Sequence, residues 1–586
     1  MVSVLILTSI TLPWIGAILV WAVGNNRPTL QHGIAVGFSL ASGFMSASLF
    51  LYPSNEMALS IPIGGAFGNF TFVPDGLGVV LAAIAALIGS LAVIFSVDYM
   101  RGDRQLGRYY SMVLLFIGSM VGLVLTSNLL LMFVFWEMTA LCSYALISFY
   151  NDDPKAVTGG IKALIMTQIG GIGLLFGALI AFSSFGSYDI SIFLQKANTL
   201  PPALLSLTAF SFLVAAAAKS AQFPFQTWLP DAMEAPTPVS ALIHAATMVN
   251  AGVYLLARFY PAFANVPGWT TAVVWVGVLS ALLSAGMALV ASDLKRVLAY
   301  STVSQLGYMV YAIGVGGIFA SQFHLLSHAV FKALLFLAAG AVIHSVGTRN
   351  MNDMGGLGKQ MPFVRNVFLI GSLALAGLPF LNGFWSKELI LEEGLAHGPL
   401  WAFIGMMMGA GLTACYTLKC VWMVFYGDQR TPLHGHDAGH FMKIALFILS
   451  IGALTSWVLV GPLGTLMELT LPFHSIKAHS TGEILIEVLT APATLLALLV
   501  IASGFALWVW RNQLSRITDL MTGIAEGARR SFGFEEINTA IVKGTNSIAE
   551  FIRNTQTGIL SVNILGILVG LVVLLVSIAV LSILGA

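Results

Sequence analysis

Long apolar segments recur along almost the whole chain, and they constrain the fold more than any other feature of the sequence. Of the 586 residues, 58% are hydrophobic and 9% are charged, too little charge to cover the surface of a water-soluble protein of this size. In lipid, only helices or a closed barrel satisfy every backbone polar group. The segments are about 20 residues long, as membrane helices require, whereas barrel strands are half that length and alternate in polarity. The predicted fold class is therefore an all-α membrane protein.

Apolar segments bounded by charged residues, glycine or proline predict about sixteen membrane-spanning helices. The first segment lacks a basic start and a clear cleavage site, so it is interpreted as a span rather than a signal peptide. The predicted spans are residues 3–23, 30–52, 77–98, 110–126, 128–149, 159–183, 203–221, 237–258, 268–290, 296–315, 317–344, 363–391, 399–427, 443–463, 491–511 and 558–584.

Lysine and arginine are distributed unevenly between the loops that join these spans. Of the 26 basic residues, 18 fall on the side that holds the odd-numbered loops, 3 on the other side, and 5 within spans. Basic loops stay in the cytoplasm. The sequence therefore predicts a multi-pass protein of a bacterial inner membrane, with cytoplasmic odd-numbered loops and both termini on the outer side.

Residues 512–557 break the pattern because they mix charge with spaced apolar residues. Ile537, Ile541, Ile548 and Ile552 recur at helical spacing. This pattern predicts an amphipathic segment along the cytoplasmic surface, before a final membrane anchor. A soluble helical hairpin is the alternative.

Ionisable side chains within spans are costly in lipid and mark an ion path by default. Glu137 and Lys219 both stand in otherwise apolar helices. Burial penalises their charged forms while mutual attraction favours them, so a small electrostatic change can switch such a pair, as a proton pump requires. A static buried ion pair that ties two helices together is the alternative.

Three polar residues of the second half share one helix face. His324, His328 and Lys332 are spaced i, i+4 and i+8. Histidine titrates near neutral pH and can relay protons. A metal pair is disfavoured, because no glutamate follows the first histidine and Lys332 would repel a cation. The sequence predicts a proton relay here and no metal site.

Two spans are interrupted by glycine and proline close to a lysine. Lys219 is followed by Ser-Ala-Gln-Phe-Pro224, and Lys387 stands after Gly377-Leu-Pro-Phe-Leu-Asn-Gly-Phe-Trp-Ser. Such interruptions free backbone carbonyls inside a protein cavity. A lysine beside a broken helix in each half is typical of internally repeated transporters. Ordinary proline kinks are the alternative.

These segments also carry a family resemblance. The chain is similar to the antiporter-like subunits shared by respiratory complex I and the Mrp-type cation/proton antiporters. The motifs that carry it are Lys219-Ser-Ala-Gln-Phe-Pro-Phe, Trp228-Leu-Pro-Asp-Ala-Met-Glu-Ala-Pro-Thr-Pro, Asp293-Leu-Lys-Arg-Val-Leu-Ala-Tyr-Ser-Thr and Asn382-Gly-Phe-Trp-Ser-Lys-Glu388. The resemblance covers residues from about 1 to 584.

The resemblance implies two inverted five-helix repeats, each with a broken helix, that together form one proton route. It divides the chain into residues 1–109 (amino-terminal helices), 110–258 (first repeat), 259–427 (second repeat), 428–511 (carboxyl-terminal helices) and 512–586 (a lateral helix that braces neighbouring subunits, then an anchor). It implies an essential glutamate, two lysines and a central relay between them. These match Glu137, Lys219 and Lys387, with the relay at His244, Lys295, His324, His328 and Lys332.

Two positions depart from the pattern of the relatives. Complex I subunits carry Arg-Val-Gly-Asp where this chain reads Gln168-Ile-Gly-Gly171. The Mrp-like motif has a lysine where Asn250 stands, which removes one charge from the relay.

The predicted function is proton translocation as one subunit of a multi-subunit membrane ion-pumping complex. Cys142, Cys415 and Cys420 form no metal-binding spacing, and no nucleotide or flavin motif is present, so no cofactor is predicted. Any redox chemistry would belong to partner subunits of such a translocase. The predicted contacts are other membrane subunits, lipids and protons, but no nucleic acid. Sodium/proton exchange is the first alternative, a membrane-embedded lipid or quinone enzyme the second, and an inert scaffold the third. The parent complex and the direction of transport stay open.

Overall fold

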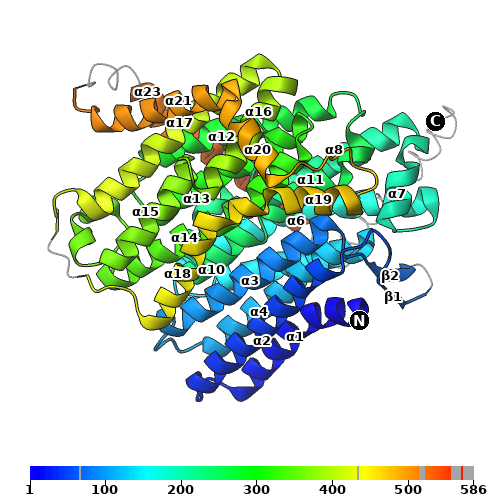
Figure 1. Ribbon diagram of the computed structural model, residues 1–586. Coiled ribbons are helices and arrows are strands. Elements are labelled where there is room, and N and C mark those ends of the chain that lie inside the picture. Colours follow the sequence, from blue (N-terminus) through cyan, green and yellow to red (C-terminus); the bar gives the residue numbers. More distant parts are fainter. Residues whose placement is uncertain (65–66, 432–434, 514–521, 556–568, 570, 572–586) are drawn as a thin grey trace. The chain divides into compact units, whose positions relative to one another are not determined.

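The structure is a computed structural model that describes residues 1–64, 67–431, 435–513, 522–555, 569 and 571. It contains two compact units, Met1–Arg529 and Arg530–Ala586. In the first unit, long helices pack side by side, with α1 and α2 beside α4 (Figure 1). The described elements are α1 (Val2–Val23), α2 (Pro28–Ser48), β1 (Leu59–Pro62), β2 (Asn69–Phe72), α3 (Gly76–Tyr99), α4 (Leu106–Leu125), α5 (Leu129–Ile147), α6 (Pro154–Phe185), α7 (Ile190–Lys196), α8 (Pro202–Lys219), α9 (Trp228–Asp231), α10 (Thr237–Ala241), α11 (Asn250–Phe263), α12 (Trp269–Val290), α13 (Leu294–Gly314), α14 (Ile318–Val346), α15 (Pro362–Ala376), α16 (Asn382–His397), α17 (Leu400–Val421), α18 (His440–Thr455), α19 (Val460–Thr470), α20 (Thr481–Thr490), α21 (Pro492–Val509), α23 (Thr522–Arg529) and α24 (Phe534–Thr555).

Thirteen helical stretches in the described part of the chain are long and apolar enough to cross a membrane, which confirms a helical, multi-pass membrane protein. Three predicted spans differ from this set. The predicted span 296–315 is helix α13, which carries many polar residues because it is packed inside the protein rather than against lipid. The predicted span 363–391 is divided between α15 and α16. The predicted anchor 558–584 lies outside the described residues, apart from 569 and 571.

Helices α12 and α13 approach each other very closely. A Cβ atom added to Gly307 would lie 2.7 Å from the backbone oxygen of Gly277, closer than real Cβ atoms come. Small residues let membrane helices gain dispersion contacts at close range. This contact fixes α13 in the interior, where most of its side chains are buried.

A two-stranded hairpin precedes α3 and was not predicted. Strands β1 and β2 pair antiparallel, with Leu59 opposite Phe72. The strands have four residues each, too few to carry a hydropathy pattern that marks them. Asp75 then caps α3, because its side chain accepts a hydrogen bond from the Gly78 N–H at 2.9 Å.

Helices α8 and α15 both end at the predicted interruptions. After Lys219 the backbone leaves the helix, and Ala221 adopts a left-handed φ of 51°. After α15, Phe380 adopts a φ of 72° before α16 begins at Asn382. The two lysines differ in position: Lys219 is the last residue before its break, whereas Lys387 lies in the second turn after its break.

A third irregularity surrounds His244. Residues Leu242–Ala246 form a π-helical turn between α10 and α11. The Asn250 side-chain amide donates to the Ala245 carbonyl at 3.0 Å, and the Thr247 hydroxyl donates to the Leu242 carbonyl at 2.5 Å. Such turns recur at functional sites because they free backbone groups and re-aim side chains.

The segment 512–557 is helical in two described pieces, α23 and α24. The helix is interrupted between these two pieces, where Ser531 and Phe532 both adopt a φ of 51°. In α24, Ile541 and Ile548 expose 61% and 63% of their surface. Residues 514–521, 556–568 and the Ile552 side chain lie outside the described part.

Candidate functional site

Glu137 lies in α5 against α6. The Gln168 amide donates a hydrogen bond to its carboxylate. Gly171, one turn further along α6, leaves room for the other oxygen, because an added Cβ would lie 2.0 Å from Glu137 Oε1. The Gln168–Gly171 departure noted in the sequence is thus the Glu137 binding surface.

Lys219 is fully buried at the end of α8. Its ammonium donates to the Trp136 carbonyl at 2.7 Å and lies 4.8 Å from the centre of the Trp136 ring. The lysine therefore bonds to the residue before Glu137. Among the described ion pairs, none joins Lys219 directly to Glu137. The predicted pair is a pair of neighbours, each held by a third group.

Trp228 lies between the Lys219 end of α8 and His244. The Trp228 indole donates to the Ala218 carbonyl at 3.0 Å, next to Lys219, and its ring centre lies 6.3 Å from that of His244. His244 is fully buried, and neither ring nitrogen has a hydrogen-bond partner among the described residues.

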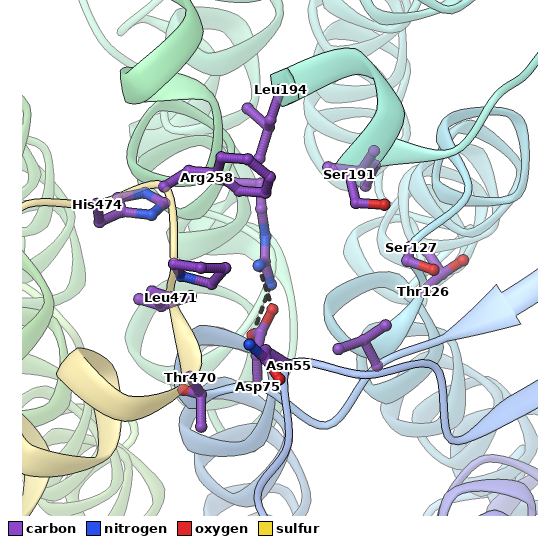
Figure 2. Close-up of a pocket in the computed structure, with 14 residues that line it drawn as sticks. Asn55, Asp75, Thr126, Ser127, Ser191, Leu194, Arg258, Thr470, Leu471 and His474 are labelled. Atoms are coloured by element: carbon purple, nitrogen blue, oxygen red, sulfur yellow. Dashed lines mark hydrogen bonds and ion pairs between the residues drawn. The ribbon is translucent and has the colours of Figure 1, made fainter. Parts of the chain in front are cut away.

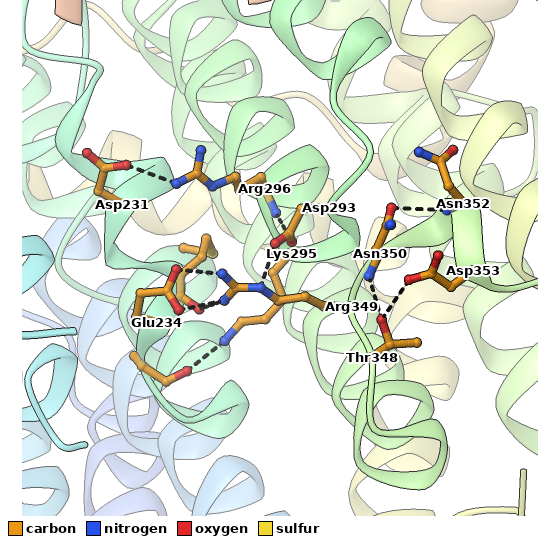
Figure 3. Close-up of polar contacts among 12 residues, drawn as sticks. Asp231, Glu234, Asp293, Lys295, Arg296, Thr348, Arg349, Asn350, Asn352 and Asp353 are labelled. Carbon is orange, nitrogen blue, oxygen red and sulfur yellow. Dashed lines mark hydrogen bonds and ion pairs between the residues drawn. The ribbon is translucent and has the colours of Figure 1, made fainter. Parts of the chain in front are cut away.

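Lys295 lies at the start of α13, inside a network of ion pairs (Figure 3). Its ammonium donates to the Ala235 carbonyl at 2.6 Å. Beside it, Arg349 contacts Glu234 at 2.5 Å and Asp293 at 2.7 Å. Burial opposes the Arg349 charge, but the hydrogen bond to Glu234 and the Asp293 charge raise the pKa of Arg349.

A second ion-pair group stands beside the first. The Asp231 carboxylate forms ion pairs with Lys162, at 2.7 Å, and with Arg296, at 3.2 Å. A polar cavity of about 550 Å³ borders both groups and is lined by Glu234, Asp293, Arg296 and Arg349, among others. Arg296, the chain neighbour of Lys295, lines this cavity, so the relay approaches the cavity at the start of α13.

Helix α14 carries the three aligned residues, all fully buried. His324 Nε2 lies 3.2 Å from Gln305 Oε1, and Nδ1 lies 2.9 Å from the Ser386 hydroxyl. An amide oxygen only accepts, so Nε2 is the donor to Gln305. The ring centres of His324 and His328 are 6.4 Å apart.

Lys332 reaches from α14 back to α13. Its ammonium donates to the Leu298 carbonyl at 3.2 Å and to the Ser301 hydroxyl. Helix α13 therefore carries Lys295 at one end, a partner of Lys332 in its middle and Gln305, the partner of His324, beyond it.

Lys387 is fully buried in α16. Its ammonium donates to the Leu375 carbonyl at 2.8 Å, across the helix break, and lies 5.7 Å from the centre of the Tyr308 ring. Ser386, the neighbour of Lys387, contacts His324, so α16 joins the relay of α14.

A separate polar group lies beside α3 and α11 (Figure 2). Arg258 is buried and bonds both oxygens of Asp75, the cap of α3, and its guanidinium also donates to the Tyr254 hydroxyl. A cavity of about 70 Å³ adjoins this pair. His474, from the connection between α19 and α20, donates from Nε2 to the Ala257 carbonyl at 2.8 Å.

The structure places the eight predicted residues on neighbouring helices, but it also adds polar residues that sequence reasoning did not select. Gln168, Ser301, Gln305 and Ser386 bond to predicted residues, and Glu388 is a fully buried carboxylate beside Lys387. An uncharged amide or hydroxyl in an apolar helix is a weak signal alone. Glu388 was visible within a recognised motif. Among the described residues no cluster of three or more His, Cys, Asp or Glu could hold a metal ion.

Comparisons with known proteins identify the family of the chain. A family described as "NADH:quinone oxidoreductase/Mrp antiporter, TM" matches residues 126–413, and "NADH-Ubiquinone oxidoreductase (complex I), chain 5 N-terminus" matches residues 61–110. NADH-quinone oxidoreductase subunit L of Pseudomonas aeruginosa is 41% identical over 475 residues, 77% of each chain. The subunit L of Escherichia coli is 38% identical over 536 residues, 87% of this chain and 84% of that protein.

Solved structures extend the likeness. A chain of the Mrp complex from a Dietzia species superposes with a TM-score of 0.82 at 29% identity, over 98% of this chain and 63% of that chain. A chain of the membrane-bound sulfane sulfur reductase, an archaeal respiratory membrane complex, matches with a TM-score of 0.71 at 24% identity, which shows a shared fold. From the family match and the subunit L relatives together, the chain belongs to the NADH:quinone oxidoreductase/Mrp antiporter family of membrane subunits.

Proposed function

We propose that the chain is a proton-translocating subunit of a multi-subunit membrane complex, and that the eight predicted residues carry the protons. One observation supports this most strongly. Six of the eight have no exposed surface, yet α14 packs against both the π-helical turn of His244 and α16, and Trp228 joins the Lys219 end of α8 to His244. Burying an ionisable group costs several kcal/mol, so a chain retains this many of them only where they have a function. These six are Lys219, His244, His324, His328, Lys332 and Lys387.

In the proposed mechanism, the state of Glu137 controls Lys219. When a proton arrives at Glu137, its negative charge disappears and the ammonium of Lys219 loses an attractive neighbour. Lys219 then releases its proton toward His244, on the far side of Trp228. The unpartnered ring nitrogens of His244 suit it to receive a proton, because no bond must first be broken.

The central relay joins the two halves. Lys295 contributes from the side of the polar cavity, and His324, His328 and Lys332 line one face of α14. Partners on α13 hold two of them in place. Lys387 then exchanges protons with the far side of the membrane.

The proposed topology has sixteen spans, inverted repeats at 110–258 and 259–427, and cytoplasmic odd-numbered loops in a bacterial inner membrane. The two helix breaks, each with a left-handed residue, support the repeat. The outer segments are 1–109 and 428–511. Residues 512–586 form the lateral helix and anchor, and the exposed apolar residues of α24 support a contact with neighbouring subunits.

Sodium/proton exchange is the second candidate, supported by the superposition on a chain of an Mrp complex. The two candidates differ in one measurement. Proton flux that depends on sodium at fixed membrane potential identifies exchange, whereas flux that is independent of sodium identifies proton pumping alone.

Two substitutions test the proposed path. Lys219→Ala and Glu137→Ala should each abolish proton transport by the assembled complex in vesicles, while subunit co-purification persists. Lys196→Ala is the control, because Lys196 ends the short helix α7, is exposed, and should leave transport unchanged. Retained transport in both test variants would rule out the mechanism.

A further inference from the structure

Helix α16 carries acidic residues beyond Lys387 that the relay does not use. Glu388 and Glu392 are four residues apart and so share one face of the helix. Glu388 has no exposed surface, and Glu392 is partly exposed. Exposure thus increases along α16 as it leaves Lys387.

Helix α20 supplies the next carboxylate in this direction. Helix α16 packs against α20, and Glu487 of α20 lies close enough to Glu392 for their charges to interact. Glu487 is exposed. The three carboxylates therefore pass from the protein interior to its surface.

Glu388 lies close enough to Lys387 for the two charges to attract each other. Adjacent residues of a helix point in different directions. Lys387 donates to the Leu375 carbonyl, and the described ion pairs include none between Lys387 and Glu388. Both Glu388 oxygens, and Oε2 of Glu392, are buried and have no partner in good hydrogen-bond geometry among the residues described, although the Thr494 hydroxyl of α21 lies near Glu388. Carboxylates buried this way are costly unless a proton or a functional partner visits them.

Glu393 shows what a structural glutamate looks like on the same helix. Its carboxylate accepts a hydrogen bond from His397 Nδ1 at 3.0 Å, one turn further on, in a local pair near the helix end. It follows Glu392 directly but lies on another face, against Gly317. Glu393 is therefore a matched control.

We infer that Glu388 and Glu392, with Glu487 at the mouth, connect Lys387 to the aqueous phase at the end of α16. The inference rests on the proposed function. In each transfer one bond breaks and one forms: the N–H of Lys387 gives its proton to a Glu388 oxygen, and Glu388 passes it to Glu392. Glu392 or Glu487 then exchanges it with water. The groups that face this row are Lys387, the Tyr308 ring and the Thr494 hydroxyl of α21, whereas Glu393 acts on Glu392 only through its charge, from another face of α16.

The test uses the whole complex in vesicles, with four glutamine variants compared at equal assembly. Glu388→Gln and Glu392→Gln should each lower proton transport at least about tenfold, since a positioned acid–base group contributes that much or more. Glu487→Gln should lower it less, because water can replace an exposed carboxylate. Glu393→Gln should match the unmodified protein.

Accessibility provides a second measurement that does not depend on activity. Glu392→Cys should react with a membrane-impermeant thiol reagent added from the side where α16 ends, and faster than Glu388→Cys. The native cysteines Cys142, Cys415 and Cys420 are buried and give the background rate.

The outcomes separate two failures. Normal transport by Glu388→Gln and Glu392→Gln, with Lys219→Ala inactive, would overturn the exit route but keep the proposed function. Transport by both Lys219→Ala and Glu137→Ala would overturn the proposed function itself. A loss in Glu388→Gln alone, with Glu392→Gln normal and Glu392→Cys unreactive, would also overturn a route between α16 and α20.

Discussion

At the scale of single residues, the environment of Glu137 depends on a missing side chain. Gly171 leaves the space that one carboxylate oxygen occupies, and Gln168 on the same helix bonds to the other. The glycine and the glutamine thus act together: one admits the carboxylate and the other orients it. A relative with aspartate at the Gly171 position would place a second acid here instead.

Gly171→Ala should therefore impair transport while the fold persists. The added Cβ would lie 2.0 Å from Glu137 Oε1, so the carboxylate must move away from Gln168. Overpacking costs about 1–3 kcal/mol, which corresponds to about tenfold or more in the rate of a step that needs this geometry. Vesicle transport assays at equal assembly measure the effect.

Gly33→Ala is the matched control for that substitution. Gly33 also lies within a helix, but an added Cβ meets nothing within 4 Å. Its transport should be unchanged. A Gly171→Ala protein as active as the Gly33→Ala protein would show that Glu137 does not need its present position.

At the scale of elements, helix interruptions and connections position the polar groups. The π-helical turn places His244 between Trp228 and α14, and the Asn250 side chain stabilises that turn by donating to the Ala245 carbonyl. The connection of residues 471–480 between α19 and α20 is anchored in a comparable way. His474 bonds the Ala257 carbonyl beside the Asp75–Arg258 pair.

This anchor predicts a pH-dependent stability. Burial lowers the pKa of His474 to about 4, and Arg258 contributes in the same direction against the Ala257 hydrogen bond. In the unfolded chain, the imidazole of His474 has the ordinary histidine pKa of about 6.5. The stabilisation from neutral His474 is thus complete above about pH 6.5 and is lost as the pH falls toward 4, by about 2 kcal/mol after discounting for partial exposure.

Thermal unfolding of the purified protein at pH 7.5, 6 and 5 measures this contribution. His474→Gln keeps a donor for Ala257 and should flatten part of the decline with falling pH. His479→Gln, an exposed position of the same connection, should leave the decline intact. Identical pH profiles for the native and His474→Gln proteins would show that His474 does not titrate between these states.

At the scale of the whole molecule, the chain has a helical membrane unit and a second unit whose helix α24 is amphipathic. The apolar residues Ile541 and Ile548 share one face of α24 and are exposed. Exposed apolar stripes of this kind mark contacts with a partner or a membrane. In an assembly, such a helix would hold neighbouring subunits together.

Replacing Ile541 and Ile548 together by asparagine should reduce the recovery of neighbouring subunits several-fold. Burying one isoleucine side chain in a contact contributes about 1.5–3 kcal/mol of binding free energy, which asparagine does not supply. The control replaces Lys543 and Glu550, on the opposite face of α24, by glutamine. Co-purification of the complex measures both variants. Full recovery with the asparagine pair would exclude α24 as a brace between subunits.

The sequence by itself determined the membrane class, most of the spans and the positions of the buried ionisable residues. Hydropathy acts over about 20 consecutive residues, and a charge within such a stretch stands out in the sequence whatever group offsets its cost in the fold. Short elements such as the β1–β2 hairpin escaped, because four-residue strands carry no such signal. The lysines beside the two helix breaks were visible because glycine and proline act locally.

Only the tertiary structure decided which groups meet. Lys219 bonds the Trp136 carbonyl, 83 residues away, rather than the Glu137 carboxylate that charge alone had predicted. Glu392 of α16 lies near Glu487 of α20, a helix much further along the chain. Such contacts depend on how helices pack and where small residues admit close approach. The physical reason is that local sequence sets the cost of burying a polar group, whereas packing sets which neighbour offsets it.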